Sequence, residues 1–396
     1  MRKFTPHNAT FGIFLAFALL PLSGLGTDIY LPSLPTMVQH FGVPAAKVQL
    51  SITLFLVGYG GGQLFAGSLM DSFGRYRIGL VALFLFGLTS LVIALAGDMD
   101  VINAMRLLQG LFGACVVVAK RSFFVDIFTG KQLKHYLSLF TVAWSLGPIV
   151  GPFVGGYFQA WFGWQANFIF LAAYSWIFLA LELWGGGESL QHFHRFHVGD
   201  IARRYADMLT HRTFMGYLLI VSLAYSTILL FSLSAPFIVE HTLQHTPIAT
   251  GYAALLMGFA WMAGGLTART QLHRPLRQKH AAAAVAILVM SGAMALTYSW
   301  VGNLPSLLAF AFCIHAAAGL AFNIYFAECL SMFPQNAALS GGLTGGLVFL
   351  LTSVFSYAVV SLTTLGNQRQ LACGYLAFGV LIASMWLLDR KHSIRQ

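Results

Sequence analysis

Charged residues are scarce in this chain of 396 residues. Only 9% of them are Asp, Glu, Lys or Arg, whereas about 25% is usual in soluble domains. Hydrophobic residues make up 58%, and 35 residues are Phe. A soluble fold has no room to bury this much apolar surface, so the composition excludes a soluble protein and indicates a chain that crosses a lipid bilayer many times.

Cysteine is scarce as well, and no ligand pattern for a metal or cofactor is evident. The four cysteines (Cys115, Cys313, Cys329 and Cys373) lie in apolar runs without paired or metal-ligand spacing. Three closely spaced histidines (His192, His194 and His197) fit no standard metal site. The pattern G-x-x-x-x-G-K-[ST] of a nucleotide-binding loop is absent. We therefore expect no metal, no cofactor and no catalytic residues, which means that the protein is not an enzyme.

Long apolar runs are what the chain has in abundance. A membrane-spanning helix needs about 20 mostly apolar residues. By this criterion we predict about twelve spans, at 10–37, 47–69, 78–96, 101–127, 135–160, 165–184, 213–238, 249–270, 281–301, 305–330, 338–364 and 371–388. The predicted fold class is therefore an all-α membrane protein. The glycine-rich run 58–62 falls inside the second span, where it favours close helix packing rather than nucleotide binding.

The positive charges predict how the chain is oriented. The formal net charge is +10, but the cations do not follow one helix face, so we expect no nucleic-acid partner. They gather in the short segments on one side of the spans, the only exceptions being Lys47, Arg369 and Arg106. Because cytoplasmic loops carry the excess of Lys and Arg, we expect both termini to be cytoplasmic and the protein to lie in the cell's inner membrane.

The longest polar interval divides the spans into two sets of six. It runs from 185 to 212 and contains Gly185, Gly186 and Gly187, followed by histidines, arginines and acids. We predict an N-terminal six-helix bundle (1–184), a cytoplasmic linker (185–212) that includes a surface amphipathic helix, and a C-terminal six-helix bundle (213–396). Doubled bundles of this kind are typical of secondary transporters.

A single acid stands out in the first span. Asp28 is the only charged residue between Phe11 and Pro35, and a carboxylate inside a bilayer costs about 2.5–3.5 kcal/mol even on a lenient scale. Such a group faces protein or water, or it carries a proton. We predict that Asp28 couples the entry of a proton to the movement of another molecule; a structural, hydrogen-bonded acid is the alternative.

Three further motifs lie in the first half. The loop between spans two and three contains Gly67, Asp71, Gly74 and Arg75, whose charges can pair in one conformation and separate in another. Span four places Arg106 on one helix face with Gln109 and Gly110; it either finds partners inside the protein or snorkels to the outer membrane surface. Span five contains five regularly spaced glycines and prolines that predict a bent helix with a flat strip for close packing, namely Gly147, Pro148, Gly151, Pro152 and Gly155.

These motifs resemble those of the major facilitator superfamily. The run 67–75 resembles its motif A, 106–110 its motif B and 147–156 its motif C, the antiporter signature, while 27–35 is similar to the first span of the bicyclomycin/chloramphenicol-resistance (Bcr/CflA) branch. The resemblance implies that Asp28 takes the proton, that Arg106 tunes its proton affinity, and that Asp71, Arg75 and Asp126 latch a cytoplasmic gate. Ser72 and Tyr76 replace usual basic residues, and Leu20 replaces a second acid found in some relatives.

Candidate substrate-binding residues are aromatic or polar side chains within the spans. They are Tyr30, Trp144, Tyr225, Trp261, Phe322 and Tyr325, together with His315 and Asn323. Aromatic walls with few polar groups suit chemically varied ligands, although each residue is also compatible with simple packing. Glu328 is expected nearer the inner surface, and Glu240 and His241 are expected to be solvated at the outer end of span seven.

The predicted function is proton-coupled efflux of small molecules by alternating access, carried out by a monomer in the lipid bilayer and powered by the proton gradient. The alternatives are a dedicated exporter of one metabolite or siderophore, an uncoupled facilitator, or a membrane sensor or scaffold that transports nothing.

Overall fold

The computed structural model describes residues 9–190, 193, 198–271, 273–333, 335, 337–362 and 366–393. The loop histidines His192, His194 and His197 lie outside these residues. The described part is almost entirely helical. Its elements are α1 (Ala9–Leu19), α2 (Leu22–Asp28), η2 (Leu31–Ser33), α3 (Leu34–Phe41), α4 (Ala45–Phe73), α5 (Arg75–Leu95), α6 (Met99–Ile127), α7 (Gly130–Phe162), α8 (Gln165–Gly185), α9 (Val198–Leu209), α10 (Arg212–Phe237), η3 (Ile238–Thr242), α11 (Pro247–Thr270), α12 (Leu276–Val301), α13 (Leu304–Ser331), α14 (Ala337–Leu362) and α15 (Gln368–Ser393).

The predicted all-α membrane fold is confirmed. Eleven helical segments among the described residues are long and apolar enough to cross a membrane. They coincide with the first eleven predicted spans, and their ends differ from the predicted ends by only a few residues. The twelfth predicted span, 371–388, coincides with α15, of which the side chains beyond residue 385 lie outside the description.

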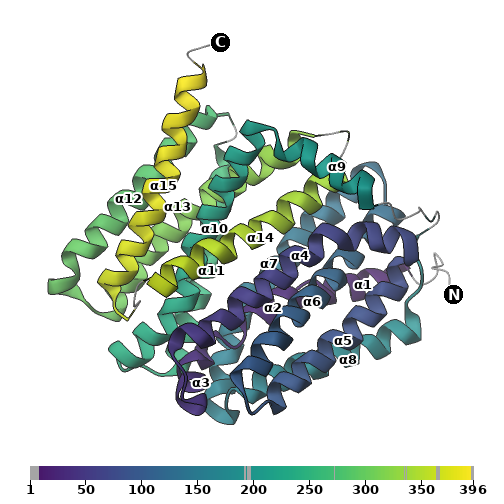
Figure 1. Cartoon of the computed structure of the whole chain (residues 1–396), viewed down its shortest axis with the longest axis horizontal. Helices are drawn as coiled ribbons and strands as arrows, with labels where there is room; N and C mark the ends of the chain where they lie inside the picture. The colour runs from purple at the N-terminus through teal and green to yellow at the C-terminus, as the bar shows by residue number, and fades with distance from the viewer. Residues whose placement is uncertain are drawn as a thin grey trace. The chain divides into compact units, whose positions relative to one another are not determined.

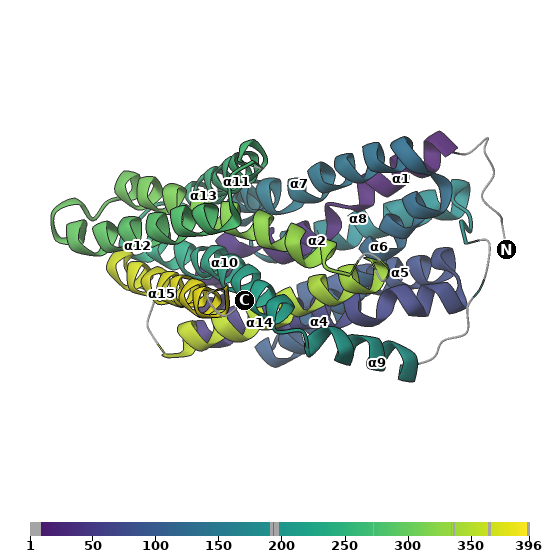
Figure 2. The same cartoon turned by 90° about the horizontal axis from the view of Figure 1, so that it is seen from above.

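The chain divides into two compact units, Met1–Arg203 and Arg204–Gln396. In the first unit α4 packs against α6, and α5 lies against both α6 and α8 (Figure 1). In the second unit α11 packs against α13, and α12 lies beside α15 (Figure 2). Because lipid tails do not drive helices together, close packing between spans depends on small side chains.

Glycines bring α4 and α6 into backbone contact. A Cβ on Gly58 would lie 1.9 Å from the carbonyl oxygen of Leu107, and a Cβ on Gly110 would lie 2.0 Å from that of Phe55. No side chain fits in either place, since real Cβ contacts are essentially never below 3.0 Å. The prediction that the glycine-rich run serves close helix packing is confirmed for Gly58.

The first span is interrupted near its middle. It consists of α1, α2, the 3-10 turn η2 and α3, with Pro21 between α1 and α2 and Pro32 inside η2. Proline lacks an N–H donor, so the helical hydrogen-bond ladder cannot run unbroken through these positions. Within a membrane, broken helices of this kind occur only where protein or an aqueous cavity satisfies the freed backbone groups.

The predicted amphipathic helix of the linker corresponds to α9. Met208 is buried and Tyr205 is half-buried on one side of it, while Arg203 and Arg204 are exposed. Burial raises the pKa of the Tyr205 hydroxyl above its ordinary value.

Candidate functional site

Asp28 lies where the first span breaks. It is the last residue of α2, and only 9% of its surface is exposed. Within the described part of the chain its carboxylate makes no hydrogen bond and no ion pair, although the charge of Arg106 acts on it. Asp28 lies at the C-terminal end of α2, and the C-terminal end of a helix favours cations rather than anions. The site therefore offers a buried carboxyl group without a hydrogen-bond or ion-pair partner among the described residues.

Arg106 of α6 is fixed by its surroundings. Its side chain is fully buried, and its Nη1 donates a 2.7 Å hydrogen bond to the carbonyl oxygen of Gly26, two residues before Asp28. The guanidinium carbon lies 4.3 Å from the ring centre of Phe55 and 4.6 Å from that of Tyr30. Such aromatic faces attract cations, so Arg106 is held by α2 and by rings rather than by snorkelling to the membrane surface.

Side chains around Arg106 complete a polar network. Arg106 donates to the Oε1 atom of Gln109, whose Nε2 donates to the hydroxyl of Ser90 at 2.7 Å. The hydroxyls of Tyr30 and Ser51 lie 2.7 Å apart. Tyr30 is fully buried, and its ring lies against the Arg106 guanidinium, so this candidate substrate residue contacts Arg106 in the first unit.

The glycine strip of α7 faces the segment that bears Asp28. A Cβ on Gly155 would lie 1.6 Å from the carbonyl oxygen of Ile29, and one on Gly147 would lie 2.4 Å from that of Pro21. Gly151 is looser, since its Cβ would lie 3.4 Å from the Ile29 nitrogen. The strip therefore sets how closely α7 approaches the residues on either side of Asp28.

The two prolines of α7 lie inside the helix, between the strip glycines. The ring of Pro148 packs against Gly24 of α2 so closely that a Cβ there would lie 2.2 Å from the proline Cδ. Pro152 is buried. Small residues on both helices are therefore needed for this contact.

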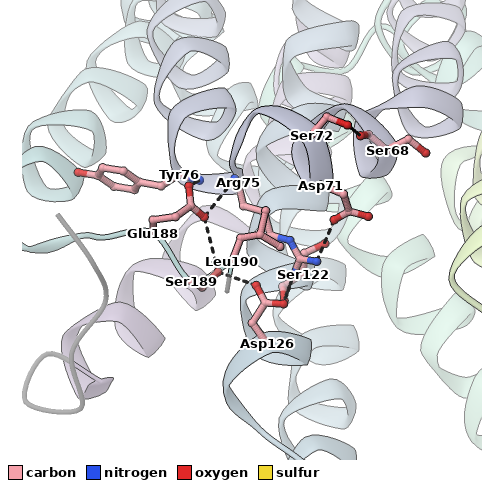
Figure 3. Close-up of polar contacts among 10 residues, drawn as sticks. All are labelled: Ser68, Asp71, Ser72, Arg75, Tyr76, Ser122, Asp126, Glu188, Ser189 and Leu190. Atoms are coloured by element: carbon pink, nitrogen blue, oxygen red, sulfur yellow. Dashed lines mark hydrogen bonds and ion pairs between the residues drawn. The ribbon is translucent and has the colours of Figure 1, made fainter. Parts of the chain in front are cut away.

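The structure brings Asp71, Arg75 and Asp126 together, at the end of α4, the start of α5 and the end of α6 (Figure 3). The Nη2 atom of Arg75 lies 3.0 Å from the Asp71 carboxylate, while Nη1 pairs with Asp126 and also donates to the Ser122 carbonyl oxygen at 2.8 Å. One guanidinium thus joins α4, α5 and α6. Fork-shaped guanidinium groups are suited to holding two carboxylates in this way.

The two motif glycines differ in their structural role. Gly74 has φ +95°, a conformation that residues with a Cβ rarely adopt, and it makes the tight connection from α4 to α5. A Cβ on Gly67 would meet nothing within 4 Å. The backbone conformation therefore accounts for Gly74, whereas packing among the described residues does not account for Gly67.

Sequence reasoning missed an ion pair near this cluster. Lys120 of α6 pairs with Glu182 in the last turns of α8, and Glu182 is buried. The Tyr76 hydroxyl donates to the Glu182 carbonyl oxygen at 2.8 Å. The signal available in the sequence was an acid inside the apolar sixth span, because such an acid needs a partner.

Candidate aromatic residues in the second unit form one cluster. The Tyr225 ring centre lies 6.1 Å from that of Trp261 and 5.8 Å from that of Phe322, and the last two lie 4.8 Å apart. All three are half-buried. Asn323 of the same helix as Phe322 donates to the Gly319 carbonyl oxygen at 2.8 Å. The structure thus brings Tyr225, Trp261 and Phe322 together, with Asn323 beside Phe322 in the chain.

Other candidates have separate partners. The Tyr325 hydroxyl is buried and lies 2.7 Å from Nδ1 of His280. Trp144 in the first unit donates to the Ser23 hydroxyl at 3.1 Å and packs against an apolar cluster that includes Phe124.

His315 is fully buried in the second unit. Its Nδ1 lies 2.7 Å from the Ala311 carbonyl oxygen of its own helix, so this nitrogen carries a proton. The ring meets Phe231 and Tyr375 edge to face, at 5.3 and 6.1 Å between centres. This environment matches the interpretation of a core histidine.

The expectation that Glu240 is solvated is wrong. It lies in the π-turn η3, it is half-buried, and it accepts a 2.9 Å hydrogen bond from the Thr250 hydroxyl. The neighbouring His241 is exposed as expected. Pro236, inside α10, precedes the π-turn and disturbs the local helical ladder, and this geometry turns Glu240 toward α11.

No cluster of His, Cys, Asp or Glu in the part of the chain that the structure describes could hold a metal ion.

Comparison with known proteins gives the family. The Major Facilitator Superfamily model matches residues 16–356. The chain is 28% identical to an uncharacterized MFS-type transporter, YdgK, of Bacillus subtilis over 88% of this chain and 90% of that protein. It is 31% identical to a bicyclomycin resistance protein homolog of Haemophilus influenzae over 57% of each chain. A crystal structure of a D-xylose-proton symporter matches the fold with a TM-score of 0.70, at 14% identity, over 94% of this chain and 97% of the other. The resemblance of the motifs to the bicyclomycin/chloramphenicol-resistance branch is confirmed, and the chain belongs to the major facilitator superfamily of membrane transporters.

Proposed function

We propose that the chain exports small drug-like molecules across the inner membrane in exchange for protons. The observation that carries the proposal is the buried Asp28 carboxyl group, which has no hydrogen-bond or ion-pair partner among the described residues. Burial favours the neutral form of such a group, whereas a nearby positive charge favours its charged form. Arg106 supplies a fixed positive charge nearby.

The proposed cycle follows from these two groups. In an outward-open state Asp28 takes up a proton, releases the substrate and permits closure. Opening to the inside lets the proton leave, and substrate binding follows. The parts that move are proposed to be the bundles 1–184 and 213–396, joined by 185–212, with both termini in the cytoplasm.

Within this cycle we assign the Asp71, Arg75 and Asp126 cluster to the cytoplasmic gate, because its ion pairs can form in one conformation and break in another. The aromatic cluster around Tyr225 is proposed as substrate-contacting surface, because aromatic side chains bind varied apolar molecules.

Proteoliposomes test the proposal directly. Bicyclomycin is the probe, because a relative is named a bicyclomycin resistance protein homolog. With an imposed pH gradient, wild-type protein is expected to move bicyclomycin and protons in opposite directions, and Asp28→Asn is expected to abolish the proton movement. Asp207→Asn, at an exposed acid of α9, is the control and should behave as wild type. Coupled movement by Asp28→Asn would reject the assignment, and wild-type transport that survives collapse of the gradient would identify a facilitator.

A further inference from the structure

The helix α5 begins without a cap of its own. Its N-terminal neighbour is Gly74, which has no side chain to accept a hydrogen bond from the first N–H groups. The first turn of any helix leaves its N–H groups unpaired, and a Ser, Thr, Asp or Asn at this position normally accepts from one of them. In α5 this function must come from elsewhere in the chain.

Glu188 supplies it, although it lies more than a hundred residues later in the sequence. One carboxylate oxygen accepts from the Arg75 N–H at 3.2 Å, and the other accepts from the Tyr76 N–H at 3.1 Å. The Leu190 N–H donates to the same carboxylate at 3.1 Å. Only 7% of Glu188 is exposed. A carboxylate at a helix N-terminus is also favoured by the helix dipole.

Ser189 makes a second contact from the same segment. Its hydroxyl donates to the Asp126 carboxylate at 2.7 Å, and Asp126 is the residue that pairs with Arg75 (Figure 3). The two neighbouring linker residues therefore bind both partners of that ion pair, one through the backbone of Arg75 and the other through the side chain of Asp126.

Glycines allow the chain to reach this position. A Cβ on Gly186 would lie 2.8 Å from a ring carbon of Tyr76, and one on Gly185 would lie 2.4 Å from the ring of Phe11. Larger residues would hold the chain away from α1 and α5. The run 185–187 thus brings the segment after α8 down onto the start of α5.

We propose that Glu188 and Ser189 are positioning residues of the cytoplasmic gate. They tie the start of the linker between the bundles to the Asp71, Arg75 and Asp126 cluster. When the linker is docked, it stabilises the closed cluster. When the cluster opens, the linker is released. The proposal rests on the proposed function only in taking this cluster to be a gate.

Opening of the cluster is measured by the rate at which N-ethylmaleimide labels a single cysteine, introduced as Ser122→Cys in full-length protein whose four native cysteines are replaced. Ser122 contacts Arg75 through its backbone, so its own side chain can be changed. Ser189→Ala is expected to raise the labelling rate about three- to tenfold, the size expected when one hydrogen bond to a charged group is lost at a half-exposed site. Ser189→Thr, which keeps the hydroxyl, should restore the original rate.

A matched control and a double mutant separate this effect from a general loosening. Ser331→Ala removes a hydroxyl that donates at 3.0 Å to the Glu328 carbonyl oxygen of its own helix, and it should leave the rate unchanged. Because Ser189 acts through Asp126, Ser189→Ala should add nothing in an Asp126→Ala background. Labelling of Ser189→Ala at the control rate, or a full additional effect in that background, would overturn the proposal.

Transport measurements keep the two proposals distinguishable. If wild-type protein exchanges bicyclomycin for protons, Ser189→Ala should change kcat and leave KM unchanged. The labelling assay involves neither substrate nor protons. If wild-type protein does not couple protons but the labelling pattern holds, the proposed function fails and the docking of the linker stands. If wild-type protein couples protons but the labelling rates are all equal, the docking proposal fails alone.

Discussion

Gly155→Ala is the most informative change to the contact between α7 and the Asp28 segment. The added Cβ would lie 1.6 Å from the Ile29 carbonyl oxygen, and real Cβ contacts are essentially never shorter than 3.0 Å. The Ile29 peptide must therefore move by about 1.4 Å, the difference between these two distances. The Ile29 carbonyl belongs to the peptide bond between Ile29 and Tyr30, one residue beyond Asp28, so its displacement shifts the backbone that positions the carboxyl group.

Free energies of packing predict that the variant folds but transports poorly. Overpacking a close contact costs about 1–3 kcal/mol, and replacing glycine by alanine in a helix returns up to about 1 kcal/mol. The net loss is smaller than the total stability of a typical folded protein. A misplacement of about 1 Å can cost a reaction about a hundredfold, and we expect a loss of proton-coupled transport of this order.

The assay compares coupled bicyclomycin transport in proteoliposomes with the thermal unfolding midpoint of the same preparations. Gly61→Ala is the matched control, because a Cβ at that span position meets nothing within 4 Å. Within the strip the expected order of damage is Gly155→Ala, then Gly147→Ala, then Gly151→Ala, following the contacts of 1.6, 2.4 and 3.4 Å. Normal transport by Gly155→Ala, or greater damage from Gly151→Ala, would refute the reasoning.

Two further predictions concern buried cations. Arg106→Lys should lower coupled transport about tenfold or more at unchanged expression, because an ammonium group cannot both donate as the guanidinium does to the Gly26 carbonyl oxygen and stack over Phe55; wild-type rates in proteoliposomes would argue against a fixed guanidinium at this site. Glu182→Gln should destabilise the protein by about 3 kcal/mol, because it leaves the mostly buried Lys120 ammonium unpaired. Unfolding measurements in detergent should then find Lys120→Met/Glu182→Met more stable than Glu182→Gln, and a double variant at least as unstable as the single one would contradict this explanation.

Hydropathy and spacing were sufficient to predict the spans and their positions. Span boundaries follow from the length of apolar chain that a bilayer requires, and this holds for the broken first span as for the others. The glycine spacing of α7 likewise predicted a flat strip. It did not identify the partner, α2, because periodicity defines a helix face but not the helix that packs on it.

The contacts that sequence analysis missed are those between distant residues. Glu188 and Ser189 lie in a polar, glycine-rich interval whose composition is typical of a linker, and their partners Arg75 and Asp126 are far away in the sequence. No local pattern encodes such a pairing. The position of Glu240 at a span end predicted exposure to solvent, whereas in the π-turn η3 it is half-buried and accepts a hydrogen bond from Thr250 of α11.

The central claim is that substrate binding and protonation of Asp28 exclude each other. The most direct measurement is the pH change of a weakly buffered solution of detergent-purified protein on addition of bicyclomycin. Wild-type protein is expected to release protons in proportion to the substrate bound, while Asp28→Asn still binds bicyclomycin and releases none. Equal proton release by both proteins would show that the coupled proton resides elsewhere.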